Sequence, residues 1–169
     1  VDETRGEVIL YENQLIDALY HSTCGGQTAS ALEAYGRDVA YLQSVECGYC
    51  QQSRRYRTEQ YFTWQQVADL AGEGKSIQVL AAAPSGRIQK IKVNHKVMSG
   101  SEFRRIFDLP STWCTISSDR EGINITSRGY GHGMGLCQYG AQGMALQGKN
   151  YRQILSHYYQ DTQLYKLPY

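Results

Sequence analysis

One stretch of the chain, from Ser127 to Ala145, is dense in glycine and reads SRGYGHGMGLCQYGAQGMA. Glycine occupies every second position from Gly129 to Gly135, with His132 in the middle of the run. Because glycine tolerates positive φ angles and the close approach of other groups, such a run is typical of a loop that lines a surface. After Gly135 apolar residues recur at roughly helical spacing. The pattern predicts a loop that leads into a helix, whose free backbone N–H groups form a ligand site beside a histidine and a thiol.

The size and charge of the chain restrict its class. Its 169 residues are enough for one domain with its own core, and 17 basic against 16 acidic residues give a net charge of +1. This balance creates no strong field, so nucleic acid and anionic membranes are not expected as partners. The 14 tyrosines suit contacts with sugars or peptides, although half-buried strand positions also explain them. No apolar run is long enough to predict a membrane span. The chain begins at Val1 without a signal peptide, which indicates a processed fragment.

Five cysteines are present, and this odd number argues against a framework made only of disulfides. Cys47 and Cys50 have the two-residue spacing found in zinc sites and in redox pairs. Cys114 falls in a predicted strand, where cysteine is usually a small buried apolar residue. The other four predict a tetrahedral site for a structural zinc ion: Cys24, Cys47, Cys50 and Cys137. His21 and His132 are alternative fourth ligands, and one disulfide with spare thiols, or free cysteines, are the alternatives to a metal.

Alternation and capping signals predict an α+β domain of mostly antiparallel strands with a few short helices. Strands are predicted at residues 7–11 and 15–21 (a hairpin), 41–45, 56–62, 76–82, 87–94 (with a bulge), 112–117 and 123–127 (a second hairpin). Short helices are predicted after Thr63, after Ser99 or Ser101, after the glycine run and after Asn150. The segment from residue 29 to 53 shows little periodicity and is predicted to be irregular and pinned by a crosslink or a metal.

Two histidines lie inside polar motifs that also contain glycine. His21 precedes Cys24-Gly25-Gly26, and His132 lies in the glycine run. Each is a candidate for acid–base chemistry, for ligand contact or for a structural role, and their similar settings favour a shared cleft. The acidic residues show no pair at an informative spacing; Glu33 follows the first motif and Glu102 begins a short helix. The residue pattern therefore nominates no catalytic acid.

With these motifs the chain resembles the stage II sporulation protein D family over nearly its whole length. The matching stretches are HSTCGGQT at 21–28, YLQSV at 41–45, RGYGHGMGLCQYGA at 128–141 and YRQILSHYY at 151–159. The resemblance implies an extracytoplasmic peptidoglycan lytic transglycosylase, which cleaves glycan strands between N-acetylmuramic acid and N-acetylglucosamine and leaves 1,6-anhydro ends. The muramyl 6-hydroxyl replaces water in this reaction, so one acid that later acts as a base is sufficient. Other members of the family are described as amidase enhancers.

The resemblance also implies which part of the family's active site this chain contains. In the family the catalytic glutamate precedes the part that Val1 begins, so no position here inherits that role and the chain corresponds to the C-terminal portion of a longer unit. The residues that carry over form the wall that binds substrate: His21, Ser22, Thr23, Gly25, Gly26, Gly131, His132, Gln138 and Tyr139. Cys137 stands where many relatives have serine, and the family includes members with and without zinc.

We therefore expect residues 1–169 to form a single domain that supplies the glycan-binding cleft of a transglycosylase in the cell envelope, in the periplasm or between forespore and mother cell. The complete protein is expected to be the enzyme. Expected partners are peptidoglycan glycan strands and either a cleaved N-terminal segment of the same protein or a cell-wall amidase. The alternatives are a non-catalytic amidase enhancer or cell-wall binding module, and a metal-stabilised structural module whose glycine loops only allow tight turns.

Overall fold

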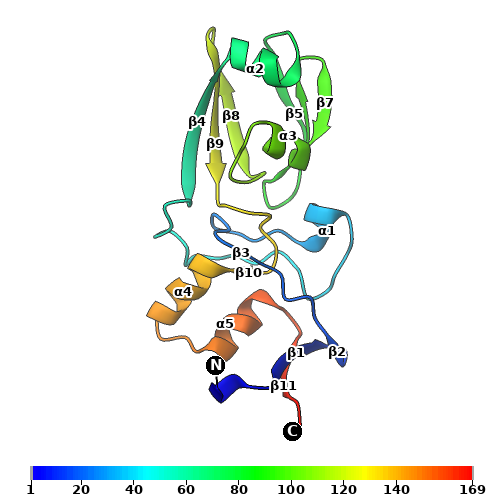
Figure 1. The fold of residues 1–169 in the computed structure, drawn as a ribbon, viewed down its shortest axis with the longest axis vertical. Helices are drawn as coiled ribbons and strands as arrows, with labels where there is room; N and C mark the ends of the chain where they lie inside the picture. Colours follow the sequence, from blue (N-terminus) through cyan, green and yellow to red (C-terminus); the bar gives the residue numbers. More distant parts are fainter. Residues whose placement is uncertain (1, 169) are drawn as a thin grey trace.

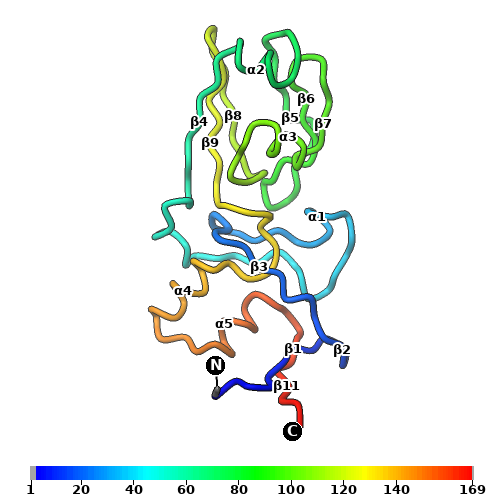
Figure 2. The backbone as a smooth tube through the Cα atoms, in the orientation of Figure 1, coloured from blue at the N-terminus to red at the C-terminus, as the bar shows by residue number. Residues whose placement is uncertain are grey.

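A computed structural model describes residues 2–168 and places them in two lobes stacked end to end (Figure 1). Residues 57–128 form one lobe, here called the β lobe. Residues 2–56 and 129–168 form the other, here called the cysteine lobe, in which the chain both begins and ends (Figure 2). Each lobe has its own hydrophobic cluster of buried side chains. The predicted α+β class is confirmed, since short helices accompany mostly antiparallel strands.

The β lobe consists of two antiparallel sheets and two helices, ordered β4-β9-β8 and β5-β6-β7. Their bounds are β4 Arg57–Thr63, α2 Trp64–Ala71, β5 Ile77–Ala82, β6 Ile88–Val93, β7 Lys96–Ser99, α3 Gly100–Ile106, β8 Cys114–Ser118 and β9 Gly122–Arg128. All of these except β7 follow the predicted pattern, and the expected bulge is a register shift where β5 pairs with β6. Buried Phe103, Ile91 and Ile123 lie in the core between the sheets and α3.

Local capping signals fix the ends of the helices. Thr63 and Gln66 form the two reciprocal hydrogen bonds of a capping box at the start of α2, and Gly72 ends that helix. Ser99 caps α3, which decides between the two predicted serines. Asn150 caps α5 in the same way as predicted. Each cap satisfies backbone N–H groups that a helix start leaves unpaired.

The cysteine lobe combines two small sheets with three short helices. One sheet has the order β11-β1-β2, and the other pairs β10 with β3 in parallel. Their bounds are β1 Glu7–Tyr11, β2 Gln14–Leu15, β3 Tyr20–His21, α1 Ala31–Tyr35, β10 Leu136–Cys137, α4 Gln138–Leu146, α5 Tyr151–Tyr158 and β11 Gln163–Lys166, after a 3-10 turn at Asp2–Thr4. None of the helices within residues 2–168 is long and apolar enough to cross a membrane.

Two strand predictions in this lobe need correction. The hairpin strand predicted at residues 15–21 is interrupted: Leu15 belongs to β2 and Tyr20–His21 form β3, and between them the Leu19 N–H donates to the nearby Asp17 carbonyl oxygen at 2.8 Å instead of to a neighbouring strand. The strand predicted at residues 41–45 is irregular backbone. Its carbonyls bond individually, Leu42 to the Ala31 N–H and Val45 to the Thr28 N–H. The irregular segment also contains α1, whose start the sequence prediction missed.

The helix after the glycine run exists, but its buried face is not the predicted apolar stripe. Leu146 is 78% exposed, and the buried positions of α4 are Gly140, Gly143 and Met144. The reason is close packing: a Cβ atom on Gly143 would lie 2.0 Å from the carbonyl oxygen of Tyr49. The helix therefore packs its backbone, rather than large side chains, against the segment that holds Cys47 and Cys50.

Candidate functional site

The two glycine-containing motifs, residues 21–28 and 128–141, run side by side. The backbones of Thr23 and Tyr130 exchange hydrogen bonds of 3.1 and 2.7 Å. Gly135 has a φ of 64°, and a Cβ there would lie 2.0 Å from the carbonyl oxygen of Leu19. Glycine at this position thus permits a close approach that no other residue allows. The glycines of this run therefore let the two motifs pack closely against each other, while part of the run also faces solvent.

His21 is buried between these motifs. Its Nδ1–H donates to the carbonyl oxygen of Met134 at 2.9 Å, and its ring centroid lies 5.7 Å from that of His132. Its Nε2 is buried without a hydrogen-bond partner in the described part of the chain. Burial lowers the pKa of His21 to about 4, and the charge of His132 contributes in the same direction. The ring is therefore neutral at pH 7.

Because His21 is buried in its neutral form, we expect the protein to lose stability in mild acid. The folded-state pKa of about 4 lies below the ordinary value of 6.5, so the unfolded chain binds the proton more tightly. The contribution of His21 is complete above about pH 6.5 and falls as the pH approaches 4, by roughly 3 kcal/mol in total. We expect His21→Asn, which keeps a donor but cannot titrate, to flatten the dependence of the unfolding free energy on pH over this window. An identical slope for both proteins in urea titrations would contradict the assignment.

His132 is half-buried and is held by the backbone on both sides. Its Nε2–H donates to the carbonyl oxygen of Tyr20 at 3.0 Å, and its Nδ1 accepts from the Met134 N–H at 3.1 Å. Burial lowers its pKa as well. Since both ring nitrogens are engaged, the ring braces the glycine run and offers a ligand its edge and face, not a free acid–base nitrogen.

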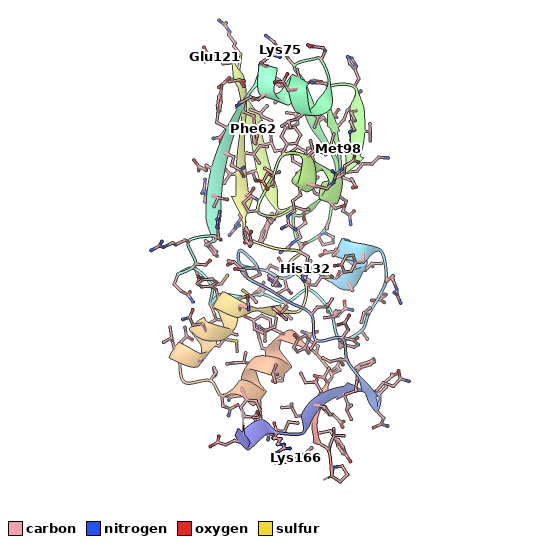
Figure 3. All side chains as sticks on the ribbon, viewed as in Figure 1. Phe62, Lys75, Met98, Glu121, His132 and Lys166 are labelled. Atoms are coloured by element: carbon pink, nitrogen blue, oxygen red, sulfur yellow. The ribbon has the colours of Figure 1, made fainter. Side chains whose placement is uncertain are left out.

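A cavity of about 670 Å³ lies at the junction of the two lobes. Its walls come from α1 of the cysteine lobe and α3 of the β lobe, and His132 lies at this junction (Figure 3). Arg87 also lines it and ties the lobes together, since its Nη2 donates to the carbonyl oxygens of Cys24 and Gln27 at 3.2 and 2.8 Å. His132 is the one predicted substrate-binding residue in the lining of this cavity.

The remaining predicted residues occupy other places. Thr23 and Gly25 are buried, Ser22, Gly26 and Gly131 are half-buried, and Gln138 and Tyr139 are exposed. Tyr139 starts α4 and is fixed to the first motif, because its N–H donates to the carbonyl oxygen of Ser22 at 3.1 Å. Arg55 lies over the exposed ring of Tyr130 in the second motif, 5.2 Å from its centroid. The structure therefore brings the two motifs together, but their polar side chains lie at different places around the junction between the lobes.

The four predicted metal ligands come together in the cysteine lobe. The sulfur atoms of Cys24, Cys47, Cys50 and Cys137 all lie within 4.8 Å of one another, and all four residues are buried. Tetrahedral zinc with Zn–S bonds of about 2.3 Å places its sulfur atoms about 3.8 Å apart. The Sγ atoms of Cys24 and Cys50 are 3.5 Å apart, and all five cysteines, each within the described residues, are free thiols. The cluster has the size and the donor set of a closed metal site.

Hydrogen-bond donors surround these sulfur atoms. The Gly140 N–H donates to Cys137 Sγ at 3.2 Å, the Gly26 N–H to Cys24 Sγ at 3.5 Å, and the hydroxyl of buried Tyr158 lies 3.2 Å from Cys47 Sγ. Such donors stabilise thiolates and orient them. Hydrogen bonding with Cys137 lowers the pKa of the Cys47 and Cys50 thiols.

Comparison with known proteins places this site in a family. No family model matches the chain. Stage II sporulation protein D of Bacillus subtilis (strain 168) is 32% identical over 97% of the chain, and that of Bacillus amyloliquefaciens is 33% identical over 95%. The chain belongs to the stage II sporulation protein D family. It covers 49% and 48% of these two proteins, so this family member spans about half the length of the curated relatives it matches.

A more distant relative has a different name. The amidase enhancer of Bacillus subtilis (strain 168) is 23% identical over 97% of the chain, which covers 32% of that protein. Both glycine-containing motifs and all four clustered cysteines of this stage II sporulation protein D family member lie within residues 21–141. The similarity to each relative spans at least 95% of the chain, so it is not confined to either lobe.

Sequence reasoning missed the residues that line most of the junction cavity. Tyr35 and Leu32 lie on α1, and Arg87, Arg104 and Arg105 face the cavity from the β lobe. One signal was available, because Arg104 and Arg105 are adjacent at the end of a correctly predicted helix. The cavity residues on α1 lie more than 60 positions from this pair, in a helix that was not predicted.

Proposed function

We propose that this chain supplies the glycan-binding cleft of a peptidoglycan lytic transglycosylase of the cell envelope. The observation that carries the proposal is the cavity between the lobes, with His132 of the glycine run in its wall, in a member of the stage II sporulation protein D family. A cavity of about 670 Å³ is large enough for a few sugar rings. Exposed Tyr35 in the cavity wall offers a flat face on which a sugar ring can stack.

In this proposal the catalytic acid comes from outside these 169 residues. The acidic residues in the cavity wall are Glu33 and Asp108. Both oxygens of Glu33 are occupied, since they accept from the N–H groups of Ser30 and Ser85 at 3.2 and 3.1 Å. A transglycosylase needs one carboxylic acid that protonates the glycosidic oxygen and then accepts the proton of the muramyl 6-hydroxyl. The residues of this chain would hold and orient the strand for that step.

We further propose that the four-cysteine cluster holds a structural zinc ion. Four thiolates fill a tetrahedral coordination sphere, so no position stays open for substrate or water. When bound, zinc would act as a crosslink between the two glycine-containing motifs and the irregular segment. Cys24 belongs to the first motif, Cys137 to the second, and Cys47 and Cys50 to the segment between them. The role assigned to the metal is to fix the shape of the cleft wall.

A second candidate is a non-catalytic role in assisting a cell-wall amidase, and the relative named amidase enhancer favours it. The products distinguish the two. If the complete protein is a transglycosylase, purified glycan strands incubated with it give fragments with 1,6-anhydro ends, detected by mass spectrometry. If it only assists an amidase, the glycan strands stay intact, and amidase added to peptide-bearing strands releases stem peptides without creating anhydro ends.

His132→Ala tests the position of the cleft. The substitution removes a ring from the cavity wall, and water can replace its bonds to the Tyr20 carbonyl and the Met134 N–H near the surface. We expect the dissociation constant for glycan strands to rise about tenfold, equivalent to about 1.4 kcal/mol. His95→Ala is the matched control, because His95 is exposed in the turn between β6 and β7. Calorimetry that gives equal affinities for both variants, with circular dichroism showing both folded, would place the cleft elsewhere.

A further inference from the structure

Basic side chains gather on one wall of the junction cavity. Arg104 and Arg105 occupy the last turn of α3, and Arg87 immediately precedes β6. Within residues 2–168 none of these three guanidinium groups forms an ion pair. The acidic residues of the wall, Glu33 and Asp108, offset two of the three charges, and the Glu33 carboxylate is already held by backbone donors. The wall therefore keeps a positive charge with free donors.

Arg87 is the most deeply placed of these cations, with only 5% of its surface exposed. Its Nη2 bonds to carbonyl oxygens, whereas its Nη1 is buried and has no hydrogen-bond partner among the described residues. Burying a cation is costly unless an anion or a full set of acceptors compensates it. If the four-cysteine cluster held a metal, its thiolates, which lie on the Cys24 side of Arg87, would offset part of this charge. The case for an anion in the cavity therefore rests on Arg104 and Arg105 together with Arg87.

The α1 side of the same cavity has a different character. Leu32 and Tyr35 line it and are 56% and 63% exposed, and Ser99 and Ser101 add hydroxyl groups at the start of α3. An exposed aromatic ring favours the apolar face of a sugar, whereas guanidinium groups favour carboxylates through paired N–H···O bonds. The cavity thus fits a ligand that combines a ring with an apolar face and an anionic group.

We propose that this cavity is a carboxylate-recognition subsite for an acidic sugar of the cell-wall glycan. The sugar ring lies against Tyr35, and the carboxylate accepts hydrogen bonds from Arg104 and Arg105. The inference rests on the proposed function and names the group that the cleft selects. Two sources in peptidoglycan supply this chemistry: the lactyl carboxylate of a muramic acid without a peptide, and the free carboxylates of an attached stem peptide. The subsite fixes which sugar of the alternating strand occupies the junction.

Three glycans of equal length test this subsite by calorimetry: a peptide-free cell-wall strand, a peptide-bearing strand, and a chitin oligomer, which has no carboxylate. We expect at least one of the acidic strands to bind about tenfold more tightly than chitin, and the difference to shrink as salt increases. Arg104→Gln and Arg105→Gln should each reduce that preference severalfold, because they weaken binding of the acidic strands more than binding of chitin. Arg120→Gln is the matched control, because Arg120 is exposed beside Glu121 at the far end of the β lobe (Figure 3).

Each outcome bears on the proposal. Tighter binding of the peptide-free strand assigns the subsite to the lactyl group, and tighter binding of the peptide-bearing strand assigns it to the stem peptide. Chitin binding as tightly as both acidic strands, or a preference that survives both arginine variants, overturns the subsite while the glycan-binding function stands. If none of the three glycans binds, the proposed function itself fails. Arg105 is exposed, so Arg105→Gln is expected to fold even if Arg104→Gln, which loses a bond to the Leu109 carbonyl, does not.

Discussion

Loss of the proposed zinc ion from the four-cysteine cluster is expected to destabilise this protein by at least about 4 kcal/mol. Metal binding in closed cysteine sites contributes on the order of 10 kcal/mol or more to folding of small domains. The described part of the cysteine lobe depends on this site for its stability, because its buried core includes all four cysteines: Cys24, Cys47, Cys50 and Cys137. Chelator treatment, or Cys50→Ser, should lower the melting temperature by about 10 °C or more. Native mass spectrometry should show one zinc per wild-type chain and none in the variant.

Cys114→Ser provides the matched control for this prediction. Cys114 is also buried, but it lies in β8 of the other lobe with its Sγ 3.4 Å from the Ser127 hydroxyl. The substitution should leave the metal content at one per chain, and chelator should still destabilise the variant. If chelator changes neither the melting temperature nor the mass of the wild-type protein, the cluster is a group of free thiols and the metal-site hypothesis is wrong.

Gly143→Ala is expected to destabilise the protein by about 2–3 kcal/mol, although alanine is normally the better helix former. In an open helix this change stabilises by up to about 1 kcal/mol. Here the new methyl group would lie 2.0 Å from the Tyr49 carbonyl oxygen and 3.1 Å from the Tyr49 Cβ. Relieving such a contact shifts α4 away from the Cys-x-x-Cys segment. The free energy that this shift costs exceeds the free energy that alanine gains through its higher helix propensity. Because α4 begins immediately after Cys137, the metal affinity should fall as well.

The control for this substitution is Gly48→Ala. Gly48 lies between Cys47 and Cys50, is exposed, and has no atom within 4 Å of a Cβ at its position. We expect it to change the free energy of unfolding by less than about 0.5 kcal/mol. Urea denaturation of both variants measures the two changes in the free energy of unfolding. A Gly143→Ala protein as stable as the wild type, with unchanged metal content, would show that α4 does not pack closely enough to position the cluster.

The β lobe could be predicted from the sequence because its elements carry their own signals. Thr63 and Gly72 bound α2, and β5, β6 and β7, like β8 and β9, follow one another as antiparallel neighbours, so alternation and turn residues suffice for them. The pairing of β4 with β9 is the long-range exception. The cysteine lobe depends on partners that are far apart in the chain. Strand β1 pairs with β11, and β3 pairs with β10 across more than 100 residues. The register of β3 depends on close contacts at glycines such as Gly135, which no local pattern specifies.

The candidate site shows the same division. The clustering of the four cysteines could be predicted, because the Cys-x-x-Cys spacing and the glycine contexts of Cys24 and Cys137 are visible in the sequence, and the four thiols do cluster. The cavity at the junction was not predicted, because Tyr35 and Arg105 become neighbours only when α1 and α3 meet. His132 shows that a correctly chosen site residue can still have contacts that the sequence does not reveal. Its context pointed to a cleft, but the backbone bonds that engage both ring nitrogens appear only in the folded protein.

Calorimetric titration of this 169-residue chain with peptide-free glycan strands is the decisive measurement for the glycan-binding role. We expect saturable binding with one strand per chain, weakened about tenfold by His132→Ala and unaffected by His95→Ala. That result would establish these residues as the part of the protein that holds the substrate. Absence of binding by a folded, metal-loaded chain would contradict the account and leave a metal-stabilised structural module as the better description.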